Sequence, residues 1–255
     1  MSTTSTGHIA VITGANRGLG RETALALAEA GVDLIITYRA NADEAASVVA
    51  EIEKLGRKAV AFRLDTGELS QFDDFAASVT GTLADEWGRD SFDFLVNNAG
   101  VGVNASIAET TVEQFDELLS VHFRGVFFLT QRLLPLIADG GRIINISTGL
   151  ARFVGPGYAA YAAMKGAIEV FTRYLAAEVG PRGISANAVA PGATATTFAG
   201  GGLQTDQVSD YLGSQTAMGH IGRPQDIGAT IAGLLTSKAN WITAQRIEAS
   251  GGQSL

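Results

Sequence analysis

Short apolar runs rich in β-branched residues alternate with helical stretches along almost the whole of this chain. Seven of these runs are predicted to be strands: Ile9–Thr13, Asp33–Tyr38, Ala59–Leu64, Phe92–Asn97, Arg142–Ser147, Ser185–Ala190 and Arg246–Ser250. Because they are apolar nearly throughout, both faces of the sheet must be covered, which is typical of a parallel sheet. The alternation predicts an α/β fold, a doubly wound parallel seven-stranded sheet with helices on both faces. A ligand site is expected at the carboxyl ends of the strands.

The stretches between the strands have the length and pattern of amphipathic or alanine-rich helices. Three of them are Arg21–Ala30, Ala42–Leu55 and Leu69–Trp87. A capping box at Thr110–Glu113 is predicted to open a long helix that continues toward Leu136. No linker or repeat divides the chain, so residues 1–255 are expected to form one domain. Residues 1–7 are expected to be a flexible leader, since they have neither the basic start nor the apolar stretch of a signal peptide.

Charge and composition exclude several classes of function. The net charge is −8, which argues against nonspecific binding to nucleic acid or to an anionic membrane. The chain has no cysteine, so disulfides, thiolate catalysis and Cys-ligated metals are excluded. The three histidines are far apart in sequence and lack metal-motif spacing, and no apolar run approaches the roughly 20 residues of a membrane span. We therefore expect a cytoplasmic protein with no bound metal, no nucleic-acid partner and no membrane partner.

A glycine-rich loop, Thr13–Gly20, joins the first predicted strand to the first helix. Glycines at 14, 18 and 20 let the backbone turn tightly and approach a pyrophosphate, whose charge is favoured at a helix N-terminus. The spacing is neither G-x-G-x-x-G nor the lysine-containing phosphate loop. A plain glycine turn is the alternative, but the position between strand and helix favours a nucleotide site.

Tyr161 and Lys165 are four residues apart in a stretch predicted to be helical, so they share one helix face. A cation within about 4 Å favours a phenolate by up to about 4 kcal/mol at an effective dielectric of about 20, or roughly three pKa units. The pair is therefore expected to bring the tyrosine into a range where it exchanges a proton with a carbonyl oxygen. Taken alone, the same spacing is more often one solvated helix face.

Four motifs, each in its expected structural context, resemble those of the short-chain dehydrogenase/reductase family. They are the T-G-x-x-x-G-x-G loop at Thr13–Gly20, Asn-Asn-Ala-Gly at Asn97–Gly100, the pair Tyr161-x-x-x-Lys165, and Pro191-Gly192 after the sixth strand. The resemblance covers nearly the whole chain. It implies a Rossmann fold, a dinucleotide cofactor and hydride transfer at a carbonyl or alcohol carbon.

This resemblance implies a role for each residue at the reacting centre. Tyr161 is expected to be the general acid in carbonyl reduction, while Lys165 lowers its pKa and holds the nicotinamide ribose. The family usually has a serine thirteen residues before the tyrosine, where this chain has Thr148. We favour Thr148 over the adjacent Ser147, because neighbouring residues of a strand face opposite ways. His122 stands where relatives commonly have asparagine; it either relays protons, titrating near neutrality, or only packs.

The resemblance also favours NADP(H) over NAD(H). NAD-binding relatives typically end the second strand with an acidic residue, whereas this chain has Tyr38 followed by Arg39. Arg17 offers a second guanidinium for a 2′-phosphate, although either arginine alone is typical of an ordinary surface. By similarity, Asp65 binds the adenine amine. The other residues expected at the cofactor are Gly14, Asn16, Gly18, Leu19, Gly20, Thr66, Asn98, Ala99, Gly100, Pro191, Gly192, Thr194 and Thr196, with Tyr161 and Lys165.

The substrate side is less well defined by the sequence. Residues 193–219 are expected to form a mobile lid because Gly200–Gly202 interrupt them, with a flexible surface loop as the alternative. Candidate pocket residues are Phe153, Tyr158, Phe198, Tyr211 and Met218, whereas Arg152 is expected to be solvated. The substrate, its stereochemistry and the direction of reaction are not determined.

The leading hypothesis is hydride transfer between NADPH and a small carbonyl or alcohol substrate. Reduction of a 3-oxoacyl thioester and a non-catalytic dinucleotide sensor are the alternatives. Family members usually form tetramers, and the long helix has more apolar side chains than its own sheet requires: Phe123, Val126, Phe127, Leu129 and Leu133. We therefore expect a homotetramer, with a dimer as the alternative.

Overall fold

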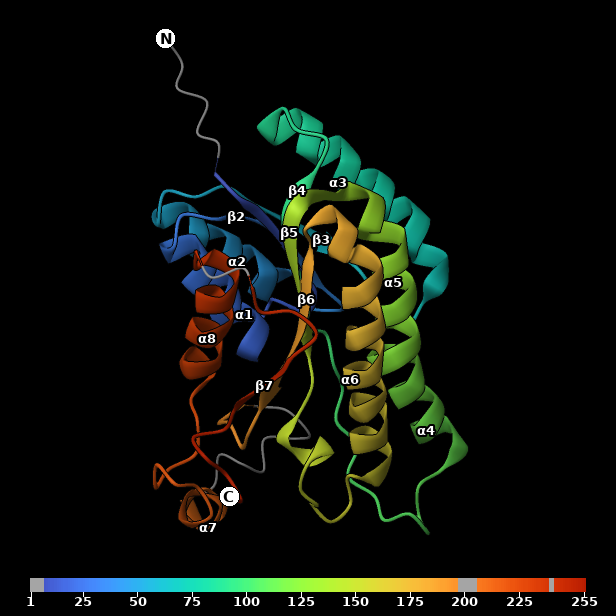
Figure 1. The fold of residues 1–255 in the computed structure, drawn as a ribbon, viewed down its shortest axis with the longest axis vertical. Helices are drawn as coiled ribbons and strands as arrows, with labels where there is room; N and C mark the ends of the chain where they lie inside the picture. The colour runs from blue at the N-terminus through green and yellow to red at the C-terminus, as the bar shows by residue number, and fades with distance from the viewer. Residues whose placement is uncertain (1–6, 197–205, 239–240) are drawn as a thin grey trace.

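A computed structural model describes residues 7–196, 206–238 and 241–255, and places one sheet between two layers of helices (Figure 1). The seven strands are all parallel, in the order β3-β2-β1-β4-β5-β6-β7. Their bounds are β1 Ile9–Ile12, β2 Asp33–Tyr38, β3 Ala59–Arg63, β4 Phe92–Asn97, β5 Ile137–Ile146, β6 Ser185–Pro191 and β7 Arg246–Ala249. The predicted doubly wound fold is confirmed.

The strand order reverses at β1, which pairs with β2 on one side and with β4 on the other. Val11 is in register with Ile35 of β2 and with Leu95 of β4. The chain winds outward from β1 to β3 and then returns to start β4 on the opposite side. In such sheets a crevice opens between the connections at the carboxyl ends of the two central strands.

The helices cover both faces of the sheet. On one face lie α1 (Gly18–Glu29), α2 (Ala42–Lys54) and α8 (Pro224–Thr236); on the other lie α3 (Phe72–Trp87), α4 (Val112–Leu119), α5 (Gly125–Leu133) and α6 (Ala159–Val179) (Figure 1). The short α7 (Asp206–Ser214) lies at the carboxyl edge of the sheet. Successive strand side chains enter opposite cores: Ala10 and Ile12 pack in one, Ile9 and Val11 in the other, all fully buried. This two-sided burial explains the continuously apolar strand sequences.

The capping box of α4 lies one residue later than predicted. The Thr111 hydroxyl accepts from the Gln114 backbone N–H at 3.2 Å, and the Gln114 side chain accepts from the Thr111 N–H at 3.1 Å. The Thr110 hydroxyl instead donates to the carbonyl of Ser106 at 2.8 Å. Both threonines suit the cap, and this second contact decides between them.

The long helix is interrupted by a π-helical turn, Ser120–Arg124, between α4 and α5. A Cβ on Gly125 would lie 1.9 Å from the carbonyl oxygen of Thr66, so glycine is required for the helix to pass this close to the loop after β3. Such π turns are frequent at functional sites, and this one carries His122 into the interior.

Two elements begin earlier than predicted. β5 begins at Ile137 instead of Arg142, because Ile137 pairs with Phe92 before a register shift that resumes at the Phe94–Arg142 pair. The sequence Asp139-Gly-Gly between them is typical of a turn, which concealed the extension. α1 starts inside the glycine loop at Gly18, earlier than Arg21.

Candidate active site

Tyr161 lies in the first turn of α6, and its side chain is hydrogen-bonded to Thr148, which follows β5. Each residue is only 8% exposed. Burial raises the pKa of Tyr161 above its ordinary value, and the hydrogen bond with Thr148 lowers it only in part. The phenol is therefore protonated at neutral pH, which is the form that can donate a proton to a carbonyl oxygen.

Lys165 lies one turn further along the same face of α6. Its Nζ donates to the carbonyl oxygen of Ile146 at 2.7 Å and lies 5.8 Å from the centre of the Tyr161 ring. Burial lowers the pKa of Lys165 to about 7. Lys165 was expected to lower the pKa of Tyr161. Burial has the largest effect on the pKa of this phenol and raises it, so the influence of Lys165 stays a prediction.

The two adjacent hydroxyls at the end of β5 point to different partners. The Ser147 hydroxyl donates to Oε1 of Glu169, two turns along α6 from Tyr161, at 2.6 Å. The Thr148 oxygen accepts from the Leu150 N–H at 3.3 Å and meets Tyr161. Thr148 is therefore the hydroxyl that shares a hydrogen bond with the tyrosine.

His122 packs its ring edge-on against Tyr161, with the ring centres 5.1 Å apart. Its Nε2 lies 2.7 Å from the Val101 carbonyl oxygen and 3.2 Å from the Val101 backbone nitrogen; the shorter contact favours the ring proton on Nε2, with Nδ1 as an acceptor. Nδ1 is buried and has no hydrogen-bond partner within the described part of the chain. Burial, with the nearby Lys165 charge, holds the pKa of His122 well below its ordinary value. The imidazole is therefore neutral near pH 7, which disfavours a relay that titrates there; a relay through the neutral ring and a packing role both stay predictions.

The glycine loop is held in place by the loop after β4. The Asn98 side chain donates to the carbonyls of Thr13 and Gly14 at 2.8 and 2.9 Å. A Cβ on Gly14 would lie 2.9 Å from the Cα of Ala99, and one on Gly20 would lie 2.4 Å from the Gly14 carbonyl oxygen. This bare backbone at the start of α1 leaves room for a pyrophosphate, so the residues present fit a dinucleotide.

The far end of the same cleft carries the two predicted arginines. Arg17 and Arg39 are exposed and line the cleft together with Asp65. Tyr38 does not line it, contrary to expectation; side chains alternate along β2, and Arg39 follows where the strand ends. Asn16 donates to the Glu44 carboxylate at 2.6 Å, a contact that sequence reasoning missed.

The loop after β6 closes the other side of the cleft. Pro191, Gly192, Thr194 and Thr196 all line it, and the Thr194 hydroxyl donates to the Gly192 carbonyl at 3.0 Å. The backbone of this loop is fixed by the C-terminal segment, because Gln253 accepts from the Ala193 N–H at 2.7 Å. No motif in the sequence pointed to that contact.

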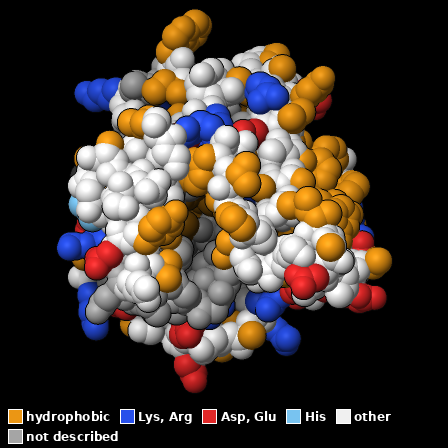
Figure 2. Space-filling model, turned by 90° about the horizontal axis from the view of Figure 1, so that it is seen from below, with side chains coloured by type: hydrophobic (Ala, Val, Ile, Leu, Met, Phe, Trp, Pro, Cys, Tyr) orange, Lys and Arg blue, Asp and Glu red, His pale blue; other side chains and the backbone are white. Residues whose placement is uncertain are grey.

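The whole cleft encloses about 930 Å³. Seen from below the view of Figure 1, hydrophobic side chains gather around a hollow in the surface (Figure 2). Its substrate end is lined by Phe153, Tyr158 and Tyr211. Met218 is 70% exposed and lies outside the lining, while Phe198 and Gly200–Gly202 lie outside the described residues.

All the other predicted catalytic and cofactor residues line this one cleft: Gly14, Asn16, Arg17, Gly18, Leu19, Gly20, Arg39, Asp65, Thr66, Asn98, Ala99, Gly100, His122, Ser147, Thr148, Tyr161, Lys165, Pro191, Gly192, Thr194 and Thr196. Arg152, expected to be solvated, instead forms an ion pair with Glu248. Within the described ranges, no group of three or more His, Asp or Glu side chains could hold a metal ion. Across those same residues, no helix is long and apolar enough to cross a membrane.

Comparisons with known proteins agree with this geometry. The family model described as enoyl-(acyl carrier protein) reductase matches residues 14–254. The tetrahydroxynaphthalene reductase PfmaG of Pestalotiopsis fici is 36% identical, over 96% of this chain and 91% of its own length. The reductase LugOII, which catalyses keto-reduction at C1 in lugdunomycin biosynthesis, is 34% identical, with a TM-score of 0.93 over 99% of this chain and 100% of its own.

The angucycline C-6 ketoreductase LanV, whose structure holds bound NADP, is 37% identical, with a TM-score of 0.92 over 100% of this chain and 98% of its own. Fold and site thus define the class of protein: an NAD(P)-dependent oxidoreductase built on a Rossmann fold. Since these likenesses extend from the glycine loop to the last strand, the chain belongs to the short-chain dehydrogenase/reductase family.

Proposed function

We propose that this protein uses NADPH to reduce a ring ketone of a fused-ring aromatic substrate. The observation that carries the proposal is the hydrogen-bonded pair of Tyr161 and Thr148 in a cleft that has a dinucleotide cradle at one end and aromatic side chains at the other. When bound, the cofactor supplies the hydride. The chain orients the carbonyl and donates the proton.

Tyr161 and Thr148 act together on the substrate oxygen. The Thr148 hydroxyl and the protonated phenol both donate hydrogen bonds to the carbonyl, which stabilises the negative charge that develops on oxygen. Tyr161 then transfers its proton. Lys165, whose pKa is about 7, can then supply a proton at neutral pH to replace the one that Tyr161 has lost.

His122 extends this proton path as an acceptor. Its Nδ1 is buried and without a partner among the described residues, and the Lys165 charge is close enough to lower its pKa. A neutral imidazole in this position holds a water by accepting one of its hydrogens, and the water passes protons to Lys165. The role is that of a fixed acceptor, since this imidazole does not titrate near neutrality.

NADP(H) is the favoured cofactor. Arg17 and Arg39 flank the end of the cleft where a 2′-phosphate would lie, and β2 ends without an acidic residue. LanV and a short-chain dehydrogenase of Burkholderia cenocepacia were both solved with NADP. The Arg39 side chain is 56% exposed, and its ion pair with Glu117 is long, at 4.0 Å. An exposed pair of this kind is weak, so little holds the guanidinium away from a phosphate.

The substrate end of the cleft suits a flat ring system. Tyr158 and Tyr161 have their ring centres 6.4 Å apart, and Phe153, Leu150 and Val154 continue the same lining. Aromatic rings bind flat aromatic ligands through stacking and edge contacts. PfmaG is by its name a reductase of tetrahydroxynaphthalene, a fused-ring aromatic compound, which fits this lining.

The test is consumption of NADPH, and separately of NADH, with 1-tetralone, 2-tetralone, 9,10-phenanthrenequinone, cyclohexanone and acetoacetyl-CoA. We expect turnover of the fused-ring substrates with NADPH, and its loss in Tyr161→Phe. Faster turnover of cyclohexanone than of the tetralones would contradict the proposal of a fused-ring aromatic substrate. NADPH binding without turnover of any compound would favour the alternative of a non-catalytic dinucleotide sensor. The presence of Tyr161, Lys165 and Thr148 argues against that alternative.

A 3-oxoacyl thioester is the second candidate, because the matching family model is described by an acyl-carrier-protein reaction. The strongly acidic chain offers little attraction for an acidic carrier protein. Faster turnover of acetoacetyl-CoA than of the tetralones would reverse this order.

We also propose that the protein is a cytoplasmic homotetramer formed by one domain. Phe123 and Phe127 line an apolar groove of about 510 Å³ between α5 and α6, and Tyr174 on its rim is 68% exposed. Leu129 and Leu133, in contrast, are buried in the protein's own core. A second copy seated on this groove would cover it. Light scattering at micromolar concentration tests the assembly, and fractionation tests the location.

The lid at residues 193–219 remains part of the proposal. Its described residues are 193–196 and 206–219, and they contribute to the cleft through Thr196 and, from α7, Tyr211. Limited proteolysis with and without NADPH tests whether cofactor protects the segment.

A further inference from the structure

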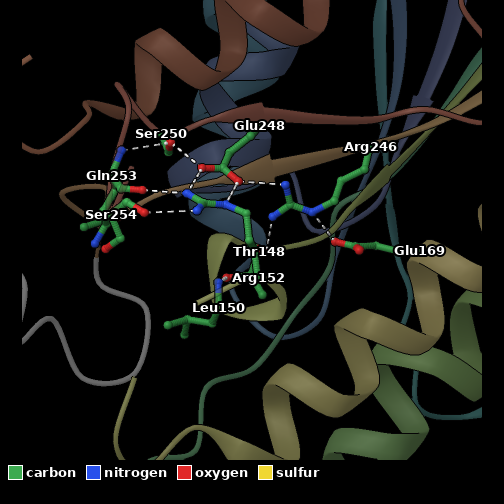
Figure 3. A network of polar contacts seen from close by, with 10 residues as sticks. Thr148, Leu150, Arg152, Glu169, Arg246, Glu248, Ser250, Gln253 and Ser254 are labelled. Atoms are coloured by element: carbon green, nitrogen blue, oxygen red, sulfur yellow. Dashed lines mark hydrogen bonds and ion pairs between the residues drawn. The ribbon is translucent and has the colours of Figure 1, made fainter. Parts of the chain in front are cut away.

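Four charged side chains link the backbone at Thr148 to β7, α6 and the end of the chain (Figure 3). They are Arg152, Glu169, Arg246 and Glu248, which we call the β7 charge network. None belongs to a motif that the sequence analysis singled out.

Arg246 is the centre of this network. Its Nε donates to Glu169 at 2.7 Å, and its two terminal nitrogens donate to Glu248 at 2.7 Å and to the carbonyl oxygen of Thr148 at 3.2 Å. Glu169 also accepts from Ser147, so one guanidinium is tied to both residues at the end of β5. The Arg246 side chain is 22% exposed, and the side chains of Glu169 and Glu248 are 15% and 18% exposed. Pairs this well covered are stronger than ordinary surface ion pairs.

Glu248 extends the network to Arg152, four residues beyond Thr148. Arg152 donates two parallel hydrogen bonds to the carboxylate, at 2.7 and 2.8 Å. These bonds and those from Arg246 hold the pKa of Glu248 down at about 2, so the carboxylate is charged throughout the working pH range. Arg152 also donates to the carbonyls of Gln253 and Ser254 at 2.6 and 3.1 Å.

The hold on the Thr148 carbonyl bears directly on the Thr148 hydroxyl. Thr148 is extended, with φ −160° and ψ 151°, and is followed by a short 3-10 turn. A donor bound to its carbonyl restricts rotation about ψ and so helps to fix the residue that meets Tyr161. Misplacing a catalytic group by about 1 Å can cost about a hundredfold in rate, so such a restraint matters to the reaction.

We propose that Arg246 is a positioning residue, which orients Thr148 toward Tyr161, and that Glu248 and Arg152 hold Arg246 in place. This inference rests on the proposed function, because it presupposes that the Thr148 hydroxyl assists proton donation. It adds a requirement that no motif contains: the last strand must be docked for the hydroxyl to be aligned.

The test is a double-mutant cycle on the full-length protein with Arg246→Met, Thr148→Ala and the double variant, assayed with NADPH and 1-tetralone. We expect Arg246→Met to lower kcat about tenfold in the parent, and less than about twofold when Thr148 is already alanine. Arg246→Lys, which keeps the charge, should recover part of the rate. The Kd for NADPH, measured by fluorescence, should stay unchanged.

Arg57→Met is the matched control. Arg57 pairs with Asp33 at 2.7 Å, and its side chain is likewise 22% exposed, but it lies at the opposite edge of the sheet. It should lower Tm as Arg246→Met does and leave kcat unchanged. If both variants lower kcat equally, the effect is general destabilisation and the proposal is wrong.

Crystal structures of the parent and of Arg246→Met give a readout that needs no substrate. We expect the Thr148 hydroxyl to leave hydrogen-bonding distance of Tyr161 in the variant; an unchanged contact overturns the inference. An active parent with an impaired Thr148→Ala and a normal Arg246→Met sinks the inference alone. Full activity of both Thr148→Ala and Tyr161→Phe sinks the proposed function itself.

Discussion

Arg246 and Thr148 are 98 residues apart in the sequence, yet the guanidinium of one donates to the backbone carbonyl of the other over 3.2 Å. The contact reaches from the first residue of β7, across the neighbouring strand β6, to a residue just beyond the end of β5. It makes the last strand part of the frame that holds the reacting centre, although that strand carries none of the four family motifs.

The two hydroxyls at the end of β5 are expected to respond differently to mutation. Thr148→Ala should lower kcat about a hundredfold, because it removes a donor to the developing oxyanion. Ser147→Ala should leave kcat within about threefold and destabilise the fold by about 1 kcal/mol, because it removes the hydrogen bond to Glu169. Steady-state kinetics and urea denaturation check both; a larger kinetic loss in Ser147→Ala would reverse the assignment.

Arg39 is expected to select the phosphorylated cofactor. Arg39→Ala should raise KM for NADPH about tenfold, the loss of one charge-assisted hydrogen bond, and leave KM for NADH nearly unchanged. Arg132→Ala is a suitable control, since Arg132 is 54% exposed against 56% for Arg39 and pairs with Asp73 away from the cleft. Equal effects on both cofactors would mean that Arg39 does not meet the 2′-phosphate.

Lys165 is expected to make the folded protein more stable as the pH rises above 7. Its pKa falls from 10.5 to about 7 on folding, so below pH 7 both states are protonated and the folded state bears the full cost of the buried ammonium. Between pH 7 and 10.5 the unfolded chain binds the proton and the folded protein does not. The free energy of unfolding should therefore rise with pH, by at most about 1.4 kcal/mol per unit.

The measurement for Lys165 is urea denaturation of the parent and of Lys165→Met from pH 6.5 to 9.5. The parent should gain stability relative to the variant as pH rises through this range. Curves that stay parallel would show that the buried amine keeps an ordinary pKa.

His122 is expected to act without titrating. An inflection of kcat near pH 7 should come from Lys165 and should persist in His122→Phe, because burial holds the pKa of His122 well below its ordinary value. His122→Phe keeps the ring packing but removes the Nδ1 acceptor, and should lower kcat about a hundredfold, the low end of the range of about 10² to 10⁴ for proton-transfer groups. His122→Asn restores an acceptor and should recover part of the rate. An unchanged rate and pH profile in His122→Phe would leave the residue with a packing role only.

Gly20 is expected to be irreplaceable. A Cβ there would lie 2.4 Å from both the Asn98 side chain and the Gly14 carbonyl, so Gly20→Ala should destabilise the fold by about 1–3 kcal/mol and weaken NADPH binding. Gly81, inside α3 with open space around it, is the control: Gly81→Ala should stabilise by about 0.5–1 kcal/mol. Thermal unfolding and NADPH titration check the pair; a stable Gly20→Ala that binds normally would show that the loop can shift.

Local sequence was sufficient to predict features that depend on a single short segment of the chain. The continuous apolar runs define the strands, and the glycine spacing defines the loop at the start of α1, because both follow from burial and backbone freedom within a few residues. The capping box at Thr111 could not be placed from sequence, because the adjacent Thr110 is equally suitable as the cap. In the structure the Thr110 hydroxyl is bonded to Ser106, and Thr111 forms the cap.

The sequence by itself determined the doubly wound sheet, the dinucleotide loop and the shared helix face of Tyr161 and Lys165, since periodicity and spacing encode these directly. Only the tertiary structure decided how the groups behave. Burial raises the pKa of Tyr161 and keeps His122 neutral, and the fold brings Arg246 to Thr148. Desolvation and contacts between distant strands depend on how all the elements pack together, and no short pattern of residues records that.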